Sequence, residues 1–188
     1  MKTQLPKPST FMLPTPAVLV TCRDSKGKAN VLTLAWTGIV CSDPPMLSIS
    51  IRPSRLSHDI IKQSREFTVN MPTAELVKAV DLCGNVSGRD VDKFEAAHLN
   101  PVKGVIVAAP LIEECPVTLE CKVTDTMLLG AHELFLAEIA ATHVRVDLID
   151  NRGRPHTEAI TPLAYCPTDH TYRAVANVVG RFGFAKPE

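Results

Sequence analysis

A group of hydroxyl, guanidinium and imidazole side chains lies where an expected strand meets an expected helix: Ser48, Ser50, Arg52, Ser54, Arg55, Ser57 and His58. The first turn of a helix offers free backbone N–H groups and the positive end of the helix dipole, and both favour an anion. Hydroxyls add donors, and a guanidinium can donate to two phosphate oxygens at once. Residues 52–65 carry four basic side chains and one acidic one, a local net charge of +3. The group therefore predicts a phosphate site, although Ser54 or Ser57 could instead simply cap the helix and leave the arginines in solvent.

A second polar segment follows an expected helix and reads Ser87-Gly88-Arg89-Asp90-Val91-Asp92-Lys93-Phe94. Glycine at its second position permits a close backbone approach, and Ser87 or Asp90 is placed to cap a short helix that carries Lys93. The segment could contribute to a ligand site. It could equally be an ordinary capped helix with a surface lysine.

Three further polar residues stand in apolar surroundings. Asn30 and Thr33 interrupt an otherwise apolar strand, and His132 begins another. Each of these side chains either contacts a ligand or is satisfied within the sheet. The residues themselves leave both alternatives open.

Several familiar catalytic motifs are missing from the sequence. It contains no G-x-G-x-x-G segment for a dinucleotide, no P-loop and no G-x-S-x-G nucleophile. After His132-Glu133, leucine stands where a zinc-protease motif needs its second histidine. The six cysteines, at positions 22, 41, 83, 115, 121 and 166, show no C-x-x-C spacing. We therefore expect no metal site and reduced, mostly buried thiols.

The spacing of apolar residues indicates which elements hold these side chains. Short apolar or alternating runs predict strands over residues 16–22, 29–36, 47–52, 66–70, 117–123, 132–139, 144–148 and 159–165. Helical spacing predicts a helix over residues 56–64, and a second helix between Thr73 as its N-cap and Gly84, which ends it.

Seven or eight strands with a few inserted helices predict a mainly β fold with helical insertions. We expect a closed antiparallel barrel, because closure leaves no exposed strand edge, and a single domain over residues 1–188. The 188 residues include 20 basic and 20 acidic side chains. This balance argues against nucleic acid or a membrane surface as a partner. With no signal peptide and no apolar stretch long enough for a membrane span, we expect a cytoplasmic protein.

The order of several segments resembles the flavin reductase-like family, whose fold is the FMN-binding split β-barrel with Greek-key order. The matching stretches are the strand 16–21, Asn30-x-x-Thr33-x-x-Trp36, Asp43-Pro44-Pro45, Ser50-Ile51-Arg52-Pro53-Ser54-Arg55-x-Ser57-His58-x-Ile60, Glu66 to Pro72, Cys83-Gly84-x-x-Ser87 to Phe94, Ala109 to Val117, Gly130-x-His132 and Tyr165. Together they span residues 14–183, and within the family they are most similar to its flavoredoxin-like members.

The resemblance implies a homodimer that binds FMN noncovalently near the subunit interface. It maps the flavin-contacting strand onto Asn30, Thr33, Leu34, Ala35 and Trp36, the phosphate-binding region onto Ser50, Ile51, Arg52, Ser54, Arg55 and Ser57, and a further contact region onto Ser87, Gly88 and Lys93. It also implies that His132 lies near the nicotinamide site that flavin reductases of this type possess.

Three functions remain open at this point. The first is an FMN-dependent oxidoreductase that passes a hydride or electrons from a reduced donor, with NAD(P)H favoured, to free flavin or another acceptor. The second is a flavoredoxin-like electron carrier that works with a redox partner protein without turning over NAD(P)H. The third is a barrel that binds a different ligand.

Overall fold

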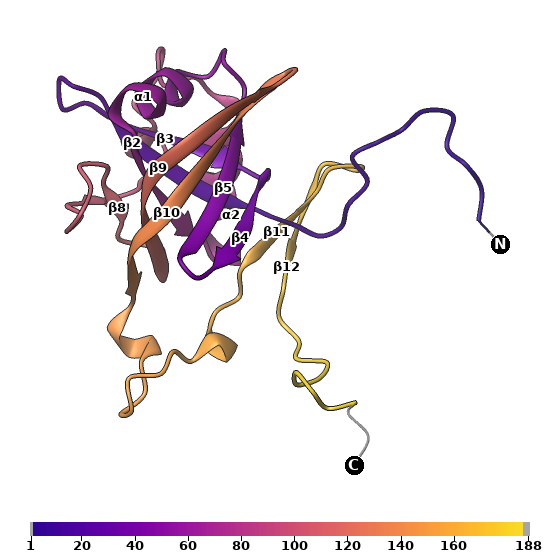
Figure 1. Cartoon of the computed structure of the whole chain (residues 1–188). Coiled ribbons are helices and arrows are strands. Elements are labelled where there is room, and N and C mark those ends of the chain that lie inside the picture. Colours follow the sequence, from indigo (N-terminus) through magenta and orange to yellow (C-terminus); the bar gives the residue numbers. More distant parts are fainter. Residues whose placement is uncertain (1, 186–188) are drawn as a thin grey trace.

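Alternating burial defines the strands of the main sheet. In β5 (Pro45–Ile51), Leu47, Ile49 and Ile51 are buried and the serines between them are half-buried, as the sequence pattern predicts. The structure is a computed structural model that describes residues 2–185. Seven antiparallel strands form the sheet in the order β3-β2-β6-β9-β10-β5-β4 (Figure 1). The other six are β2 (Val18–Arg23), β3 (Ala29–Leu34), β4 (Thr37–Ser42), β6 (Glu66–Met71), β9 (Val117–Leu129) and β10 (His132–Val144).

The two edge strands of this sheet follow each other directly in the chain. β3 ends at Leu34 and β4 begins at Thr37, so Ala35 and Trp36 alone join opposite edges of the sheet. A link of this length spans at most about 11 Å, and the two edges therefore converge at this end. The fold is mainly β with helical insertions, as predicted. Among residues 2–185 no ladder joins β3 to β4, so closure into a complete barrel stays a prediction.

Helix α1 (Leu56–Ser64) and one face of the sheet enclose the larger core. The helix lies in the connection from β5 to β6, which passes the two intervening strands β10 and β9, as the predicted Greek-key order requires. Ile60 and Ile61 of α1 pack in this core with Phe67 and Phe135. The predicted helix over residues 56–64 is confirmed, because its apolar side chains do lie on one buried face.

A second core covers the opposite face of β2 and β3. Leu19 and Val31 pack there with Val80 and Cys83 of α2 (Val77–Asn85), and Phe94 of α3 (Lys93–Ala96) belongs to the same core. β2 is buried on both faces, because its residues alternate between the two cores. Polar side chains that point from β3 toward α2 are therefore enclosed between the sheet and this helix.

Short elements complete the structure. β1 (Thr15–Pro16), β11 (Leu163–Cys166) and β12 (Thr171–Ala174) form a three-stranded sheet, and β7 (Pro101–Val102) pairs with β8 (Leu111–Ile112). Three 3-10 helices are η1 (Ala74–Leu76), η2 (Val146–Leu148) and η3 (Thr157–Ala159). Figure 1 shows the segments before β1 and after β12 extending away from the main sheet. Within residues 2–185, no helix has the length and apolarity needed to cross a membrane.

Some predicted boundaries are wrong. The strand predicted over residues 29–36 ends at Leu34, β11 begins only at Leu163, and residues 144–148 form the end of β10 followed by η2. Thr73 makes no side-chain capping bond. Gly84 lies inside α2, where an added Cβ would stand 3.3 Å from the Cβ of Thr33, so this glycine allows α2 to pack closely on β3. The sequence pattern predicts neither β4 nor β12, because most residues of these edge strands are exposed.

Candidate functional site

The structure brings every predicted site residue to one of two adjoining cavities, each of about 140 Å³. The first, called the helix cavity, is lined by Asn30, Leu32, Ser54, Arg55, Leu56, Ser57, Val86, Ser87, Gly88, Arg89 and Lys93. The second, called the strand cavity, is lined by Leu32, Thr33, Leu34, Ala35, Trp36, Ser50, Ile51, Arg52, Arg55 and His132. Leu32 and Arg55 line both, so the two cavities form one continuous candidate site.

The start of α1 faces the helix cavity without a side-chain cap. Arg55 is the N-cap residue in extended backbone, and no side chain bonds to the first turn. The interpretation that Ser54 or Ser57 caps this helix is therefore wrong. Ser57 is buried, and its Oγ accepts a hydrogen bond of 2.8 Å from Asn30 Nδ2. The His58 N–H donates to the Arg55 carbonyl at 3.0 Å, whereas the N–H groups of Leu56 and Ser57 have no acceptor among the described residues, which suits an anion site.

Gly88 forms a close wall of the same cavity. A Cβ added to this residue would lie 2.0 Å from Asn30 Oδ1 and 3.2 Å from a methyl carbon of Leu56. The segment after α2 thus approaches β3 and α1 more closely than a side chain would allow. Glycine at position 88 therefore lets the backbone itself line the helix cavity.

Lys93 supplies a buried cation to the helix cavity. Its side chain is 4% exposed, and Nζ donates to the Cys83 carbonyl at 2.7 Å. Asp92, rather than Ser87 or Asp90, caps α3 by accepting from the Phe94 and Glu95 N–H groups, and this cap turns Lys93 inward. The interpretation of Lys93 as a surface lysine is wrong.

No carboxylate among the described residues forms a salt bridge with Lys93. Burial lowers the pKa of its ammonium, and the nearby Arg55 charge lowers it further, against an opposing effect of Cys83. A buried ammonium that lacks an anionic partner is costly, so an anion in the helix cavity would stabilise it.

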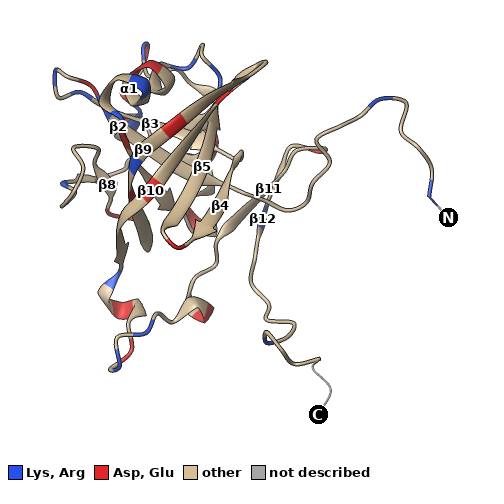
Figure 2. Cartoon of the chain, viewed as in Figure 1, with Lys and Arg blue, Asp and Glu red and all other residues tan. Residues whose placement is uncertain are grey.

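The basic residues of the segment 52–65 separate into two groups. Arg52 and Arg55 line the cavities. Lys62 instead donates to Glu133 at 3.0 Å, and Arg65 donates to carbonyls of β9. Figure 2 shows the basic residues on and around α1. Only part of the local charge predicted from the sequence therefore reaches the site, but Arg89, whose Nη1 donates to the Ser54 carbonyl at 3.0 Å, is added to it.

The end of β3 forms one wall of the strand cavity. The Thr33 hydroxyl donates to the Val80 carbonyl of α2, so it is satisfied by α2 rather than by a neighbouring strand. Ala35 and Trp36 are half-buried, and the Trp36 carbonyl accepts from the Ser50 N–H at 2.9 Å. Opposite them, burial lowers the pKa of His132, and the charge of Arg52 lowers it further. His132 is therefore neutral at pH 7 and presents one donor and one acceptor.

A hydrogen-bond network centred on the buried Glu133 joins α1 to β10. His58 is 5% exposed; its Nε2 lies 2.7 Å from Glu133 Oε2, and its Nδ1 lies 3.0 Å from Asp59 Oδ1. The hydrogen bonds from Lys62 and His58 hold the pKa of Glu133 below its usual range. His58 thus points away from the cavities and joins α1 to β10 beside Ser57 and His132. Sequence reasoning missed Glu133, although the alternation of β10 places it on the same buried face as Phe135.

The thiols do not take part in the site. Cys22, Cys83, Cys115, Cys121 and Cys166 are buried and Cys41 is half-buried, and all are free among the described residues. Burial raises the pKa of the Cys22 thiol to about 12, which keeps it protonated and unreactive. No group of three or more metal-ligating side chains occurs within residues 2–185.

Comparison with known proteins identifies the family of this chain. The sequence profile of the flavin reductase like domain matches residues 10–174. The chain belongs to the flavin reductase-like family. This flavin reductase-like protein is similar to flavoredoxin of Desulfovibrio vulgaris (Miyazaki F), with 31% identity, a TM-score of 0.91 and coverage of 98% of this chain and 99% of that one. Flavoredoxin from Methanosarcina acetivorans gives 30% identity and a TM-score of 0.88, with 98% and 97% covered.

One curated relative comes from Archaeoglobus fulgidus. It is 39% identical over 112 residues, which are 60% of this chain and 63% of the relative, so the match spans less than two thirds of that protein. Family membership and the structural similarity give the chain the split-barrel architecture of the family.

The residues of the two cavities fit a flavin that carries a phosphate. The helix cavity offers an anion three independent features: an uncapped helix start, a close backbone approach at Gly88 and the unpaired charge of Lys93. The strand cavity extends from it along the ends of β3 and β5, next to half-buried Trp36. A ligand with an anionic group at one end and a flat, largely apolar ring at the other would fit with the anionic group in the helix cavity and the ring in the strand cavity.

Proposed function

We propose that the protein binds FMN, with the phosphate in the helix cavity and the flavin ring in the strand cavity. The buried, unpaired ammonium of Lys93 carries this proposal, since it calls for an anion at the place where the helix start and Gly88 also favour one. Ser54, Arg55, Ser57, Ser87 and Gly88 surround the phosphate. Asn30 sets the position of Ser57 through its hydrogen bond.

The flavin ring lies along residues 33–36 and 50–52 in this proposal. When bound, the flavin supplies the two-electron chemistry that no side chain here offers. Arg52 places a positive charge at the strand cavity, which favours negative charge on the ring. The backbone of Leu34, Ala35 and Ile51 provides polar contacts along the ring edge without side chains that compete for the space.

We infer that the protein is an oxidoreductase that takes electrons from a reduced donor and passes them to free flavin or another acceptor. NAD(P)H is the donor we favour, because the neutral His132 lines the strand cavity and has a ring nitrogen with which to hydrogen-bond the nicotinamide carboxamide. Residues 1–188 act as one domain in this proposal, and the active form is a homodimer.

A second candidate function is that of an electron carrier that exchanges electrons with a redox partner protein and does not turn over NAD(P)H. The similarity to flavoredoxin over 98% of the chain favours it. The two candidates share the flavin site and differ in the donor.

One set of measurements tests both candidates. We expect the purified protein to show a flavin absorption spectrum, or to acquire one when FMN is added, and to bind FMN more tightly than riboflavin because riboflavin lacks the phosphate. Bleaching of the spectrum by anaerobic NADH or NADPH, with turnover of free FMN, would support the reductase. A holoprotein that dithionite reduces but nicotinamides do not would support the carrier. A colourless protein that takes up no FMN would refute both.

A further inference from the structure

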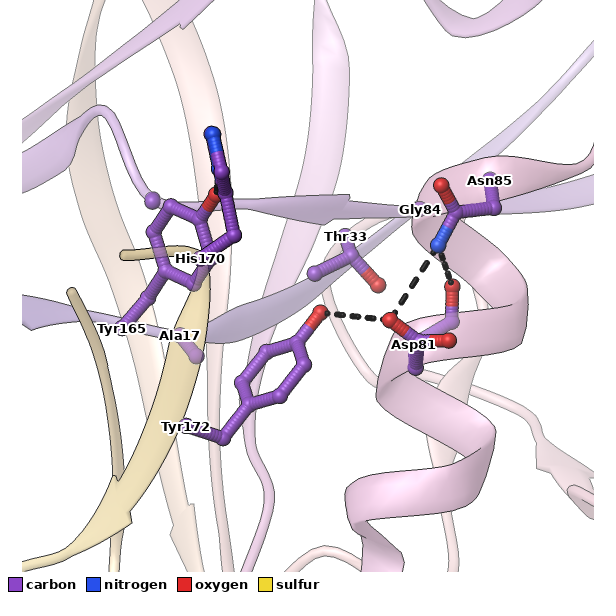
Figure 3. A pocket seen from close by; sticks show the side chains of 9 residues that line it. Ala17, Thr33, Asp81, Gly84, Asn85, Tyr165, His170 and Tyr172 are labelled. Carbon is purple, nitrogen blue, oxygen red and sulfur yellow. Dashed lines mark hydrogen bonds between the residues drawn. The ribbon is translucent and has the colours of Figure 1, made fainter. Parts of the chain in front are cut away.

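A third and larger cavity, of about 340 Å³, lies between α2 and the β11–β12 hairpin. Figure 3 shows Tyr165, His170 and Tyr172 on one side of this tyrosine cavity, and Asp81 and Asn85 of α2 on the other. None of these five residues belongs to the proposed flavin site. Sequence reasoning assigned the cavity no role.

The tyrosine cavity adjoins the proposed flavin ring. Thr33 and Ala35, at the end of β3, line both this cavity and the strand cavity. The two cavities are therefore neighbours at the end of β3. A ligand in the tyrosine cavity would lie beside the place proposed for the flavin ring.

The walls of the tyrosine cavity are held in place by hydrogen bonds. Tyr172 donates from its hydroxyl to Asp81 Oδ1 at 3.2 Å, and Asn85 Nδ2 donates to the same oxygen at 3.1 Å. The Tyr165 hydroxyl lies 2.7 Å from His170 Nδ1, and the two tyrosine rings are 5.5 Å apart and tilted by 50°. His170 has a φ of +57°, a conformation that few residues other than glycine adopt, which fixes its position in the turn. The cavity is thus organised before any ligand enters.

The charge of the lining favours some ligands over others. Asp81 is its only carboxylate, and neither lysine nor arginine lines the cavity among the described residues. Burial raises the pKa of Tyr172 to about 12, with a further contribution from Asp81, so its ring remains a neutral phenol. Aromatic faces attract flat rings and cations, whereas Asp81 repels anions.

We propose that the tyrosine cavity binds a flat aromatic molecule that is uncharged or positively charged, and that it discriminates against carboxylates and phosphates. Asp81 and Tyr172 are the residues that determine this specificity. The binding itself follows from the cavity alone. The further statement that the ligand is the organic substrate of the flavoprotein rests on the proposed function.

Three indoles that differ only in charge provide the test: tryptamine, a cation; tryptophol, which is neutral; and indole-3-acetate, an anion. Isothermal titration of the full chain loaded with FMN should give an affinity order of tryptamine, then tryptophol, then indole-3-acetate. We expect tryptamine to bind only about fivefold more tightly than indole-3-acetate, because Asp81 is exposed and solvent screens its charge.

Two variants locate the binding. Asp81→Asn keeps an acceptor for Tyr172 but removes the charge, so it should abolish the preference for tryptamine while tryptophol binds as before. Tyr172→Leu should weaken all three indoles, and a thermal unfolding curve checks that it folds. Glu138→Gln, an exposed carboxylate on β10, is the matched control and should leave the order unchanged.

The outcomes separate this inference from the proposed function. A protein that shows a flavin spectrum but binds the indoles without charge preference, or not at all, overturns the inference and leaves the proposed function standing. Competition between FMN and tryptamine for one site also overturns it, because the cavity would then be part of the flavin site. Charge-selective binding to a protein that takes up no FMN supports the binding site and removes its role in flavin chemistry.

Discussion

Burying the ammonium of Lys93 costs free energy that one hydrogen bond to the Cys83 carbonyl does not recover. Three other features belong to the same helix cavity. The start of α1 has no side-chain cap, Gly88 leaves no room for a Cβ, and Ser57 is held by Asn30 instead of serving as a cap. The phosphate proposed for this cavity would account for the buried ammonium and the uncapped helix start, and Gly88 and Ser57 form the walls around it.

Lys93→Met tests this account directly. The substitution removes the ammonium group and keeps the unbranched chain that precedes it, so we expect FMN affinity to fall about 30-fold, equivalent to about 2 kcal/mol for a buried charged hydrogen bond. Riboflavin affinity should change little, because riboflavin carries no phosphate. The protein without flavin should be as stable as the unmodified chain or more so, since the desolvation of the ammonium is no longer needed. Flavin fluorescence titration and thermal unfolding measure these quantities.

Arg55→Ala serves as the comparison, because Arg55 is exposed and its loss should weaken FMN binding by a smaller factor.

The lowered pKa of Lys93 also predicts that FMN binding depends on pH. Because burial and the Arg55 charge lower this pKa, the charged form that binds phosphate is lost at a lower pH than for an ordinary lysine. FMN affinity should therefore decline at alkaline pH in the unmodified protein and much less in Lys93→Met. Equal losses of FMN and riboflavin in Lys93→Met would contradict the assignment.

Gly88→Ala tests the close approach in the same cavity. The added methyl group would stand 2.0 Å from Asn30 Oδ1, so Asn30 must move and its bond to Ser57 must break. We expect a loss of about 2 kcal/mol in the free energy of unfolding, measured in urea, together with weaker FMN binding. Adding Asn30→Ala should recover part of the stability but not the binding. Additive losses in the double variant would show that the two residues do not interact.

At the scale of elements, loop 103–109 is held mainly by the buried carboxylate of Glu120, and the Ala108 N–H donates in addition to Glu66 Oε2 at 2.9 Å. Glu120 of β9 is fully buried and accepts from the backbone N–H groups of Val105, Ile106 and Val107 at 2.7–2.9 Å, and from His143 Nε2 at 2.6 Å. Burial alone would raise the pKa of Glu120, but these hydrogen bonds outweigh it and hold the pKa below its usual value. The loop is therefore anchored to the sheet by an ionised side chain.

Glu120→Gln should destabilise the protein by about 2 kcal/mol at neutral pH, because the amide cannot accept all of these hydrogen bonds. Since the folded-state pKa of Glu120 lies below the unfolded-state value, its stabilisation is present above the unfolded-state pKa and is lost as pH falls through the folded-state pKa. The difference between the two proteins should therefore shrink under acidic conditions. Urea unfolding at several pH values measures it, and a difference that grows toward low pH would contradict this role.

The helices and strands also differ in how well the sequence predicts them. α1 and β5 are predicted correctly because each has a buried apolar face whose spacing is visible locally. β4 and β12 lack such a face, since they pair at sheet edges and stay exposed. The glycine at 84 looks like a helix stop, yet it is needed for contact with Thr33, a residue far away in the chain. The burial of Lys93 likewise depends on the Cys83 carbonyl and on the Asp92 cap, which spacing alone does not reveal.

At the scale of the molecule, the candidate site is assembled from four separate parts of the chain: residues 30–36, 50–57, 86–93 and His132. Taken alone, the sequence pattern of each part is as compatible with a structural role as with contact to a ligand. Their order resembles a known family, and this resemblance is what predicts that they meet. The structure brings them together, and it adds the tyrosine cavity, whose residues come from α2 and from the β11–β12 hairpin that the sequence pattern only partly predicts.

The molecule also exposes apolar residues that nothing within its described part covers. Ile39 and Val40 of β4 are 66% and 51% exposed, and Val178 and Val179 after β12 are 67% and 97% exposed. Such surfaces are typical of an interface with another chain. We expect sedimentation equilibrium to give twice the chain mass of 20.4 kDa, as the proposed homodimer requires. Charged substitutions at both Ile39 and Val40 should shift the equilibrium toward the monomer, and a monomeric FMN-loaded protein at micromolar concentration would refute the homodimer.

The link of Ala35 and Trp36 has a consequence for how members of this family can diverge. It joins opposite edges of the main sheet and at the same time forms a wall of both the strand cavity and, through Ala35, the tyrosine cavity. An insertion there would move β4 away from β3 and open both cavities, whereas the long connection between β10 and β11 borders neither. Length variation among relatives should therefore accumulate between residues 145 and 162 and be absent at residues 35–36, which makes this dipeptide a fixed point for aligning distant sequences.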